Sequence, residues 1–201
     1  MKWKAIEPHR GDFATETPDN MINWAIKNDI TVRGKFRTHL ICFIFFASFI
    51  KGHALLWSKF GNNPEWTWDI FGEEFEEVVY KHVDDTMDHF NSLGVVHWDV
   101  INEMIDEHQG PLNHTFYIDQ SGNQNIRADI HIHVKEKYPQ NMFYVNDYGI
   151  IMDTAHRFSS FQKLLRDLFS RGVQIDGIGL QSHINGDHTN LFCHWLIVSY
   201  F

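Results

Sequence analysis

Short apolar runs alternate along the chain with longer amphipathic segments, and this alternation restricts the fold more than any other feature. The apolar runs, which predict strands, lie at 1–6, 30–32, 95–100, 142–145 and 175–180. Apolar residues three or four positions apart predict helices over 19–27, 71–93, 126–138 and 155–171. A repeated strand–helix order with β-branched strands predicts a parallel sheet covered by helices.

Two parallel architectures fit this order, a doubly wound sheet and an eight-fold β/α barrel. A glycine-rich phosphate loop after a strand would favour a doubly wound nucleotide-binding sheet, and the sequence has none. Polar and aromatic residues instead gather where strands end, at Lys2-Trp3, 53–57, Asn102-Glu103, 146–148 and 181–183. Active sites of barrels lie at that rim, so we favour a (β/α)8 TIM barrel. The predicted strands are too few to close one, and we expect a partial barrel.

Composition excludes several classes of partner. The chain has 201 residues, with 26 acidic against 17 basic side chains and a formal net charge of -9. Nucleic acid is therefore not expected as a partner, because its phosphates require a clustered basic surface. The longest apolar run, 40–50, is shorter than the roughly 20 residues that a membrane span needs. The first residues lack the apolar core of a secretory signal, so the sequence assigns no localisation.

Two apolar stretches do not fit the alternation. Residues 35–52 interrupt what otherwise reads as one strand, because Asp-Ile-Thr-Val-Arg-Gly, ending at Gly34, would continue into His53. The centre of this stretch is Phe/Ile/Leu-rich without a period, and the codons for Gly34-Lys35 can contain a splice-donor sequence. We interpret 35–52 as non-coding sequence translated in frame; a buried hairpin or helix inserted in a loop is the alternative. Residues 188–201 resemble it as an aperiodic apolar tail.

The motif with the clearest chemistry is His-Trp-Asp-Val-Ile-Asn-Glu, in which an apolar strand ends at Asn102-Glu103. Glycosidic cleavage needs a proton for a poor alkoxide leaving group, and a carboxyl in a partly apolar setting can supply it near neutral pH. The neighbouring amide can hydrogen-bond a sugar hydroxyl while charge develops at the anomeric carbon. An isolated Asn-Glu pair would more often be solvated, so the motif needs support from elsewhere in the chain.

That support comes from five motifs in order. The sequences MKWKAIEPHRG, VRG–HALLW, HWDVINE, YVNDYGI and DGIGLQSH each end a predicted strand. Together they resemble glycoside hydrolase family 10, which consists mainly of endo-β-1,4-xylanases built on a (β/α)8 barrel. The resemblance covers 1–187 apart from 35–52, and implies that about strands two to six are present while strands one, seven and eight are missing.

The resemblance also implies roles for individual residues. Glu103 matches the general acid/base of the family. Residues expected to contact the sugar at the cleavage subsite are Lys2, His53, Trp57 and Asn102.

Further matches lie on the two later strands. Asn146 and Tyr148 match a substrate-binding Asn-Asp-Tyr segment near the acid/base, and Gln181 belongs to a Gln-x-His motif. The histidine of that motif, His183, is expected to orient the nucleophile.

The nucleophile itself has no match. In the family it is a Glu a couple of dozen residues after Gln-x-His, whereas only twenty residues follow Gln181 here and none is Glu. The implied mechanism is retaining double displacement, which needs two carboxyls about 5 to 5.5 Å apart. We therefore expect this chain, as written, to be inactive or nearly so in hydrolysis.

Two other interpretations compete with an enzyme. Zinc binding is suggested by spacings such as His131-x-His133 and 183–188, but residues two apart on a helix point away from each other. We expect no metal and no other cofactor. A non-catalytic carbohydrate binder is the second alternative, because Trp57, Trp66, Trp68 and Tyr148 could stack on sugar rings. Whether the chain is an enzyme or a carbohydrate binder, its expected partner is a xylan-like polysaccharide. The folded chain is expected to be a monomer. Members of the family are typically extracellular.

Overall fold

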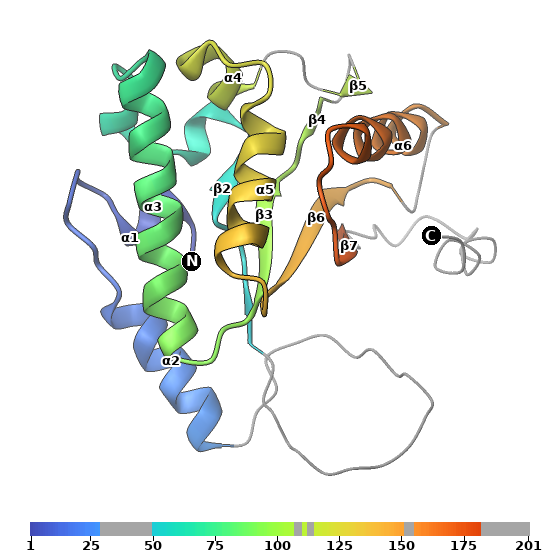
Figure 1. Ribbon diagram of the computed structural model, residues 1–201. Coiled ribbons are helices and arrows are strands. Elements are labelled where there is room, and N and C mark those ends of the chain that lie inside the picture. Colours follow the sequence, from blue (N-terminus) through green and yellow to red (C-terminus); the bar gives the residue numbers. More distant parts are fainter. Residues whose placement is uncertain (29–49, 107–109, 112–114, 151–154, 182–201) are drawn as a thin grey trace, which may run out of the picture.

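The computed structural model describes residues 1–28, 50–106, 110–111, 115–150 and 155–181 (Figure 1). Its helices and short 3-10 turns are α1 (Trp3–Ile6), α2 (Glu16–Lys27), η1 (Phe60–Asn62), η2 (Glu65–Thr67), α3 (Gly72–Ser92), α4 (Phe116–Ser121), α5 (Ile126–Lys137) and α6 (Ala155–Ser170). Its strands are β1 (Lys51–Gly52), β2 (Leu56–Trp57), β3 (His97–Asn102), β4 (Ile105–Asp106), β5 (Gly110–Pro111), β6 (Met142–Tyr148) and β7 (Gly177–Gln181).

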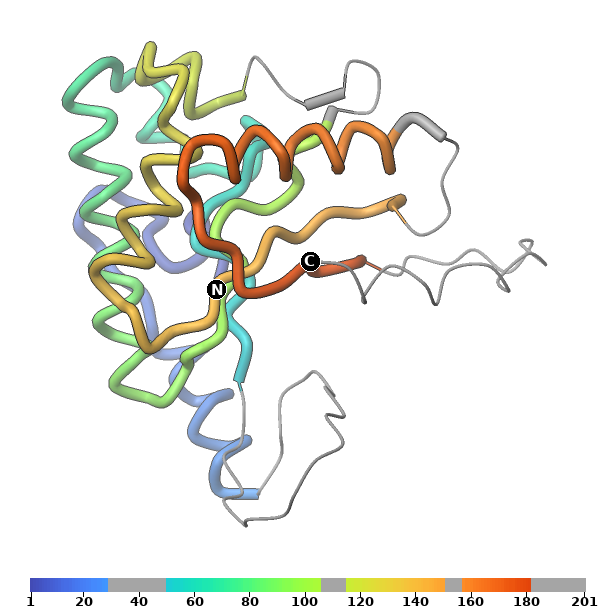
Figure 2. Tube along the Cα trace, turned by 45° about the vertical axis from the view of Figure 1, so that its right-hand side comes forward, coloured from blue at the N-terminus to red at the C-terminus, as the bar shows by residue number. Residues whose placement is uncertain are grey.

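A parallel sheet organises these elements. Its strand order is β1-β3-β6-β7, and β2 also pairs with β3 further along that strand. Figure 2 shows α3, α5 and α6 along the outer side of the strands. Because all pairs in this sheet are parallel, the carboxyl ends of the strands meet at one rim. The predicted parallel sheet covered by helices is confirmed.

Helix α3 shows why the predicted helices form. Phe75, Val79, Val83, Met87 and Phe90 recur at three-to-four spacing, and each is fully buried in the core. The helix ends before Gly94, whose φ of 83° is the left-handed conformation that glycine adopts without strain. The amide of Val95 donates to the carbonyl of Phe90, and the chain then enters β3. Helix and strand thus bury one continuous apolar surface.

The prediction of a strand over 1–6 was wrong. Residues Trp3–Ile6 form one turn of helix, and Trp3 and Ile6, three positions apart, are both 2% exposed. The indole nitrogen of Trp3 donates to Glu7, and the ring stacks on His82 at 4.3 Å between centroids. A short run with so few apolar residues fits period two and period 3.6 alike, and packing against α3 decided between them.

Some predictions fall outside the described residues. The expected strand at 30–32, residues 35–49 of the stretch interpreted as non-coding, His183, and the tail 188–201 are among them. The last residues of that stretch are described: Ile50 is 4% exposed, and Lys51–Gly52 pair with His97–Trp98 as β1. A Cβ on Gly52 would lie 2.2 Å from the Trp98 ring, so only glycine fits at this close approach. Within the described helices, none is both long and apolar enough to cross a membrane.

Candidate active site

Glu103 lies directly after β3 at the carboxyl rim of the sheet and is 8% exposed. Its φ of 57° is in the left-handed region, which a non-glycine residue adopts at a cost of roughly 1 kcal/mol or more. Its amide donates to the carbonyl of Asn146 on β6 at 3.0 Å. The carboxyl group is therefore carried on a turn that is fastened to the neighbouring strand.

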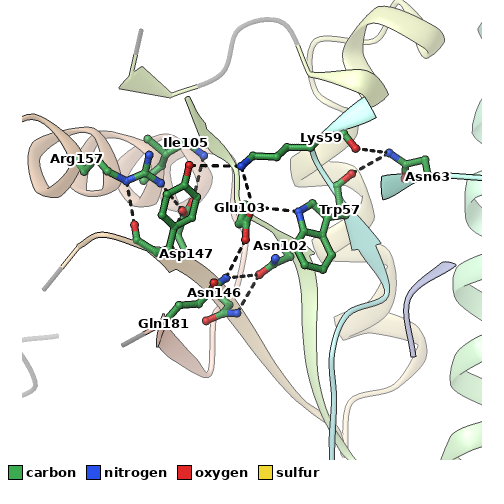
Figure 3. Close-up of polar contacts among 11 residues, drawn as sticks. Trp57, Lys59, Asn63, Asn102, Glu103, Ile105, Asn146, Asp147, Arg157 and Gln181 are labelled. Carbon is green, nitrogen blue, oxygen red and sulfur yellow. Dashed lines mark hydrogen bonds and ion pairs between the residues drawn. The ribbon is translucent and has the colours of Figure 1, made fainter. Parts of the chain in front are cut away.

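Three side chains from other elements contact this carboxylate (Figure 3). The indole nitrogen of Trp57 donates to Oε2 at 3.1 Å, and Lys59 Nζ lies 3.3 Å from the same oxygen. Gln181 Nε2, from the end of β7, donates to Oε1 at 3.3 Å. Both oxygens thus have a partner before any substrate binds, which restricts the rotation of the side chain.

An amide network lies beneath Glu103. Oδ1 of Asn102, a fully buried residue, accepts from Asn146 Nδ2 at 2.9 Å and from Gln181 Nε2 at 3.1 Å. These contacts link the ends of β3, β6 and β7. Gly179 leaves room for the network, because a Cβ there would lie 2.3 Å from Asn146 Oδ1. Asn102 Nδ2 is buried without a partner among the described residues, and it remains as a donor at the rim.

Lys2 and His53 flank Trp57 on the other side. Lys2 Nζ lies 4.2 Å from the centre of the Trp57 ring, a cation–π contact. The His53 ring meets Trp57 edge-on at 5.4 Å, and its Nδ1 is 2.8 Å from Oδ2 of buried Asp99. Trp57 is itself fixed by Tyr117, whose hydroxyl accepts from the Trp57 amide at 3.2 Å. Burial raises the pKa of Tyr117, so the hydroxyl stays neutral.

The structure therefore brings most of the predicted site together. Lys2, His53, Trp57, Asn102, Glu103, Asn146 and Gln181 belong to one connected group of contacts. Tyr148 joins through Lys59, whose Nζ is 3.4 Å from the Tyr148 hydroxyl and 4.9 Å from its ring centre. His183 lies outside the described residues.

Three further residues that the structure joins to this group were assigned no role from the sequence. Lys59 contacts Glu103 directly, and Asp147 is fully buried on the adjacent strand β6, paired with Arg157 at 2.7 Å. Burial raises the pKa of Asp147 to about 6, although hydrogen bonds and Arg157 act against that change. Asp147 was visible inside the Asn-Asp-Tyr motif, but Lys59 and Arg157 carry no sequence signal, since their partners lie far along the chain.

The histidines suggested as metal ligands have other partners. His131 Nδ1 is 2.7 Å from the carbonyl of Arg127 inside α5, and His133 Nε2 is 2.7 Å from Asp84 on α3. Within the part of the chain that the structure describes, no three His, Cys, Asp or Glu side chains are grouped as metal ligands would be.

Comparison with known proteins gives consistent matches. The family model described as glycosyl hydrolase family 10 matches residues 47–193. Endo-beta-1,4-xylanase Xyn10C of Cellvibrio japonicus is 28% identical over 193 residues, which cover 92% of this chain and 28% of that protein. Endo-1,4-beta-xylanase B of Thermotoga neapolitana is 28% identical over 190 residues, covering 92% of this chain and 47% of that protein.

Solved structures support the fold. The intracellular xylanase of Thermoanaerobacterium saccharolyticum, as a variant with bound xylotriose, superposes with a TM-score of 0.74 at 22% identity. The match covers 91% of this chain and 53% of that one. Xylanase10C of Cellvibrio japonicus, as a variant with bound xylopentaose, gives a TM-score of 0.72 at 24% identity, over 90% of this chain and 33% of that one. These neighbours are (β/α)8 barrels, and the predicted partial TIM barrel is confirmed.

The chain spans less than half the length of the two curated xylanases. The family match nevertheless extends over most of the 201 residues and includes the rim that carries Glu103 and its partners. On this match, the chain belongs to glycosyl hydrolase family 10.

Proposed function

We propose that this chain carries the acid/base part of a site that hydrolyses internal β-1,4 bonds of xylan by a retaining mechanism. The observation on which this depends is the position of Glu103, which is held at the rim by Trp57, Lys59 and Gln181. Relatives named as xylanases, and neighbours with bound xylo-oligosaccharides, support xylan as the substrate.

In the proposed first step, Glu103 donates its proton to the glycosidic oxygen while that oxygen leaves the anomeric carbon. A second carboxylate forms the new bond to that carbon. In the second step Glu103, now a carboxylate, takes a proton from water, and the water oxygen displaces the second carboxylate. The Asn102 amide and Lys2 are proposed to hydrogen-bond the sugar hydroxyls during both steps.

We propose that no carboxylate among the described residues takes the part of this second carboxylate. Among the described residues, Asp99 on β3 and Asp147 on β6 are buried carboxylates; Asp99 is engaged by Lys51 and His53, and Asp147 by Arg157. Releasing Asp147 would break an ion pair whose two side chains are 0% and 12% exposed, at a cost of several kcal/mol. We therefore propose that the 201 residues bind xylo-oligosaccharides but do not turn them over.

The packing of Trp66 and Trp68 reduces the number of rings that a dedicated carbohydrate binder could use for stacking on sugars. Trp66 meets Trp3 edge-on at 5.9 Å and donates to the carbonyl of Glu7, while Trp68 lies against Phe60 at 4.5 Å. Both rings are thus used in packing, and we place sugar stacking at Trp57 instead.

The test is a calorimetric titration of the purified chain with xylopentaose, followed by chromatography of the products. We expect binding without cleavage, and loss of binding in Trp57→Ala. Trp24→Ala is the matched control, since Trp24 is 61% exposed on α2, and it should leave binding unchanged. Cleavage that disappears in Glu103→Ala would overturn the proposed inactivity and keep the role of Glu103. Absence of binding would overturn the proposed function of this chain.

A further inference from the structure

The turn that carries Glu103 is fastened at two consecutive residues of β6. The Glu103 amide donates to the carbonyl of Asn146, and the Ile105 amide donates to Oδ2 of Asp147 at 3.1 Å. The left-handed residue thus lies between two anchored amides. Strained backbone of this kind persists only where its surroundings hold it in place.

Asp147 is held just as firmly from its other side. Oδ1 accepts from the Tyr148 amide at 2.8 Å and from Arg157 Nη2 at 2.7 Å. Arg157 Nε donates in turn to the Tyr148 carbonyl at 2.9 Å, and its guanidinium lies 3.9 Å from the Tyr148 ring centre. Asp147 is fully buried and Arg157 is 12% exposed at its side chain.

The fold leaves room for this arrangement at Gly149. Its φ is 67°, and a Cβ there would lie 3.0 Å from Arg157 Cδ. The guanidinium of α6 can therefore lie against the end of β6. The pair connects α6, β6 and the Glu103 turn through one carboxylate (Figure 3).

From these contacts we propose that Asp147 is a positioning residue for Glu103. Its carboxylate, oriented by Arg157, fixes the Ile105 amide and so keeps Glu103 in the left-handed conformation that presents its carboxyl group to Trp57. The role of Asp147 in catalysis rests on the proposed function, whereas its role in holding the Glu103 turn does not. Burial raises the pKa of Asp147 to about 6, so most of the carboxylate is ionised at pH 7 and can pair with Arg157.

A matched control exists at the other end of the same strand. Asp176 accepts from the Phe143 amide at 2.9 Å and is paired with Lys135 at 2.8 Å. It has the same chemistry as Asp147, a carboxylate joining a helix cation to a main-chain amide, but it contacts the first residues of β6. Asp176→Asn therefore reports the general cost of losing such a pair.

The experiment uses NMR of the unliganded chain at pH 7 and needs no activity. Asp147→Asn should shift the Trp57 indole N–H resonance, which reports the contact with Glu103, and speed hydrogen exchange of the Ile105 amide roughly tenfold. Asp176→Asn should leave both unchanged. Asp147→Glu keeps the charge and should therefore restore part of the protection of the Ile105 amide. That restoration would show that the faster exchange in Asp147→Asn does not come from loss of the fold.

An unchanged Trp57 resonance and unchanged Ile105 exchange in Asp147→Asn would overturn the inference. So would the same changes in Asp176→Asn. Failure of the proposed function appears separately, as absence of xylopentaose binding in the unmodified chain.

Discussion

Close approach of backbone to side chain decides which residues the site tolerates. Gly52 lies against the buried Trp98 ring, and Gly179 lies against Asn146 in the amide network. Neither has the positive φ that makes glycine recognisable in a turn, since both are in strands. Their requirement comes from neighbours on the adjacent strand, so it is visible only once the register is known.

At this scale, Gly52→Ala should lower the free energy of unfolding by about 1–3 kcal/mol. The added methyl would lie 2.2 Å from a ring that is fully buried and cannot move away without shifting β1 or β3. Gly61→Ala is the control, because nothing lies within 4 Å of its Cβ position. Urea unfolding measures both, and equal midpoints for the two variants would contradict the packing described here.

The main helices and strands show how far sequence reasoning reached. Helices α3, α5 and α6 and strands β3, β6 and β7 were predicted because each is long or strongly patterned. Motifs at strand ends predicted Trp57, Asn102, Glu103, Asn146 and Gln181 as site residues, and the structure brings these side chains into contact at the rim. Helix α1 was missed because one turn has too few residues to show a period, and its conformation depends on contacts with α3.

Lys59 and Arg157 were missed for a different reason. Their partners, Glu103 and Asp147, lie in other elements, and a lone cation in a sequence is usually a solvated side chain. Only the parallel register of β2, β3 and β6 brings these groups together. Electrostatic contacts across elements are therefore the part of the site that the sequence leaves open.

Helix α5 leads to a prediction about pH. His131 is 2% exposed, and burial lowers its pKa to about 4. The unfolded chain takes up a proton near pH 6.5, where folded His131 stays neutral, so stability falls as the pH drops from about 6.5 to 4. The loss from this residue reaches on the order of 3 kcal/mol.

His131→Leu should remove this contribution, because leucine fills the site without titrating. Urea unfolding at pH 7, 6, 5 and 4.5 should give a shallower decline for the variant than for the unmodified chain. Parallel curves would show that His131 is protonated in the folded state, and would contradict its burial as a neutral ring.

On the scale of the whole molecule, the residues before the stretch 35–52 could replace the end of that stretch in the sheet. The sequence Val32-Arg33-Gly34, directly before this stretch, resembles Ile50-Lys51-Gly52 at the end of it. Deleting 35–52 would place Arg33 where Lys51 pairs with Asp99, and Gly34 where Gly52 meets Trp98. The deletion also shortens the connection after α2, which lowers the entropy cost of closing it by about 1 kcal/mol.

We therefore expect the 35–52 deletion to fold with a midpoint at least equal to that of the full chain. The control is a deletion of 34–52, which removes one residue more. It would place Arg33 against Trp98 and should prevent folding. Circular dichroism during thermal unfolding distinguishes them. If both deletions fold equally well, Lys51–Gly52 are not held in the sheet as described.

We propose that Glu103 supplies the proton in glycosidic cleavage and that no carboxylate among the described residues serves as the nucleophile. Azide can serve as that nucleophile: it forms a bond to the anomeric carbon as the glycosidic oxygen leaves with the Glu103 proton. The measurement is mass spectrometry of xylopentaose incubated with the purified chain and azide. We expect xylo-oligosaccharyl azides from the unmodified chain and none from Glu103→Ala. Equal yields from the two proteins, or no azide product from either, would contradict the claim.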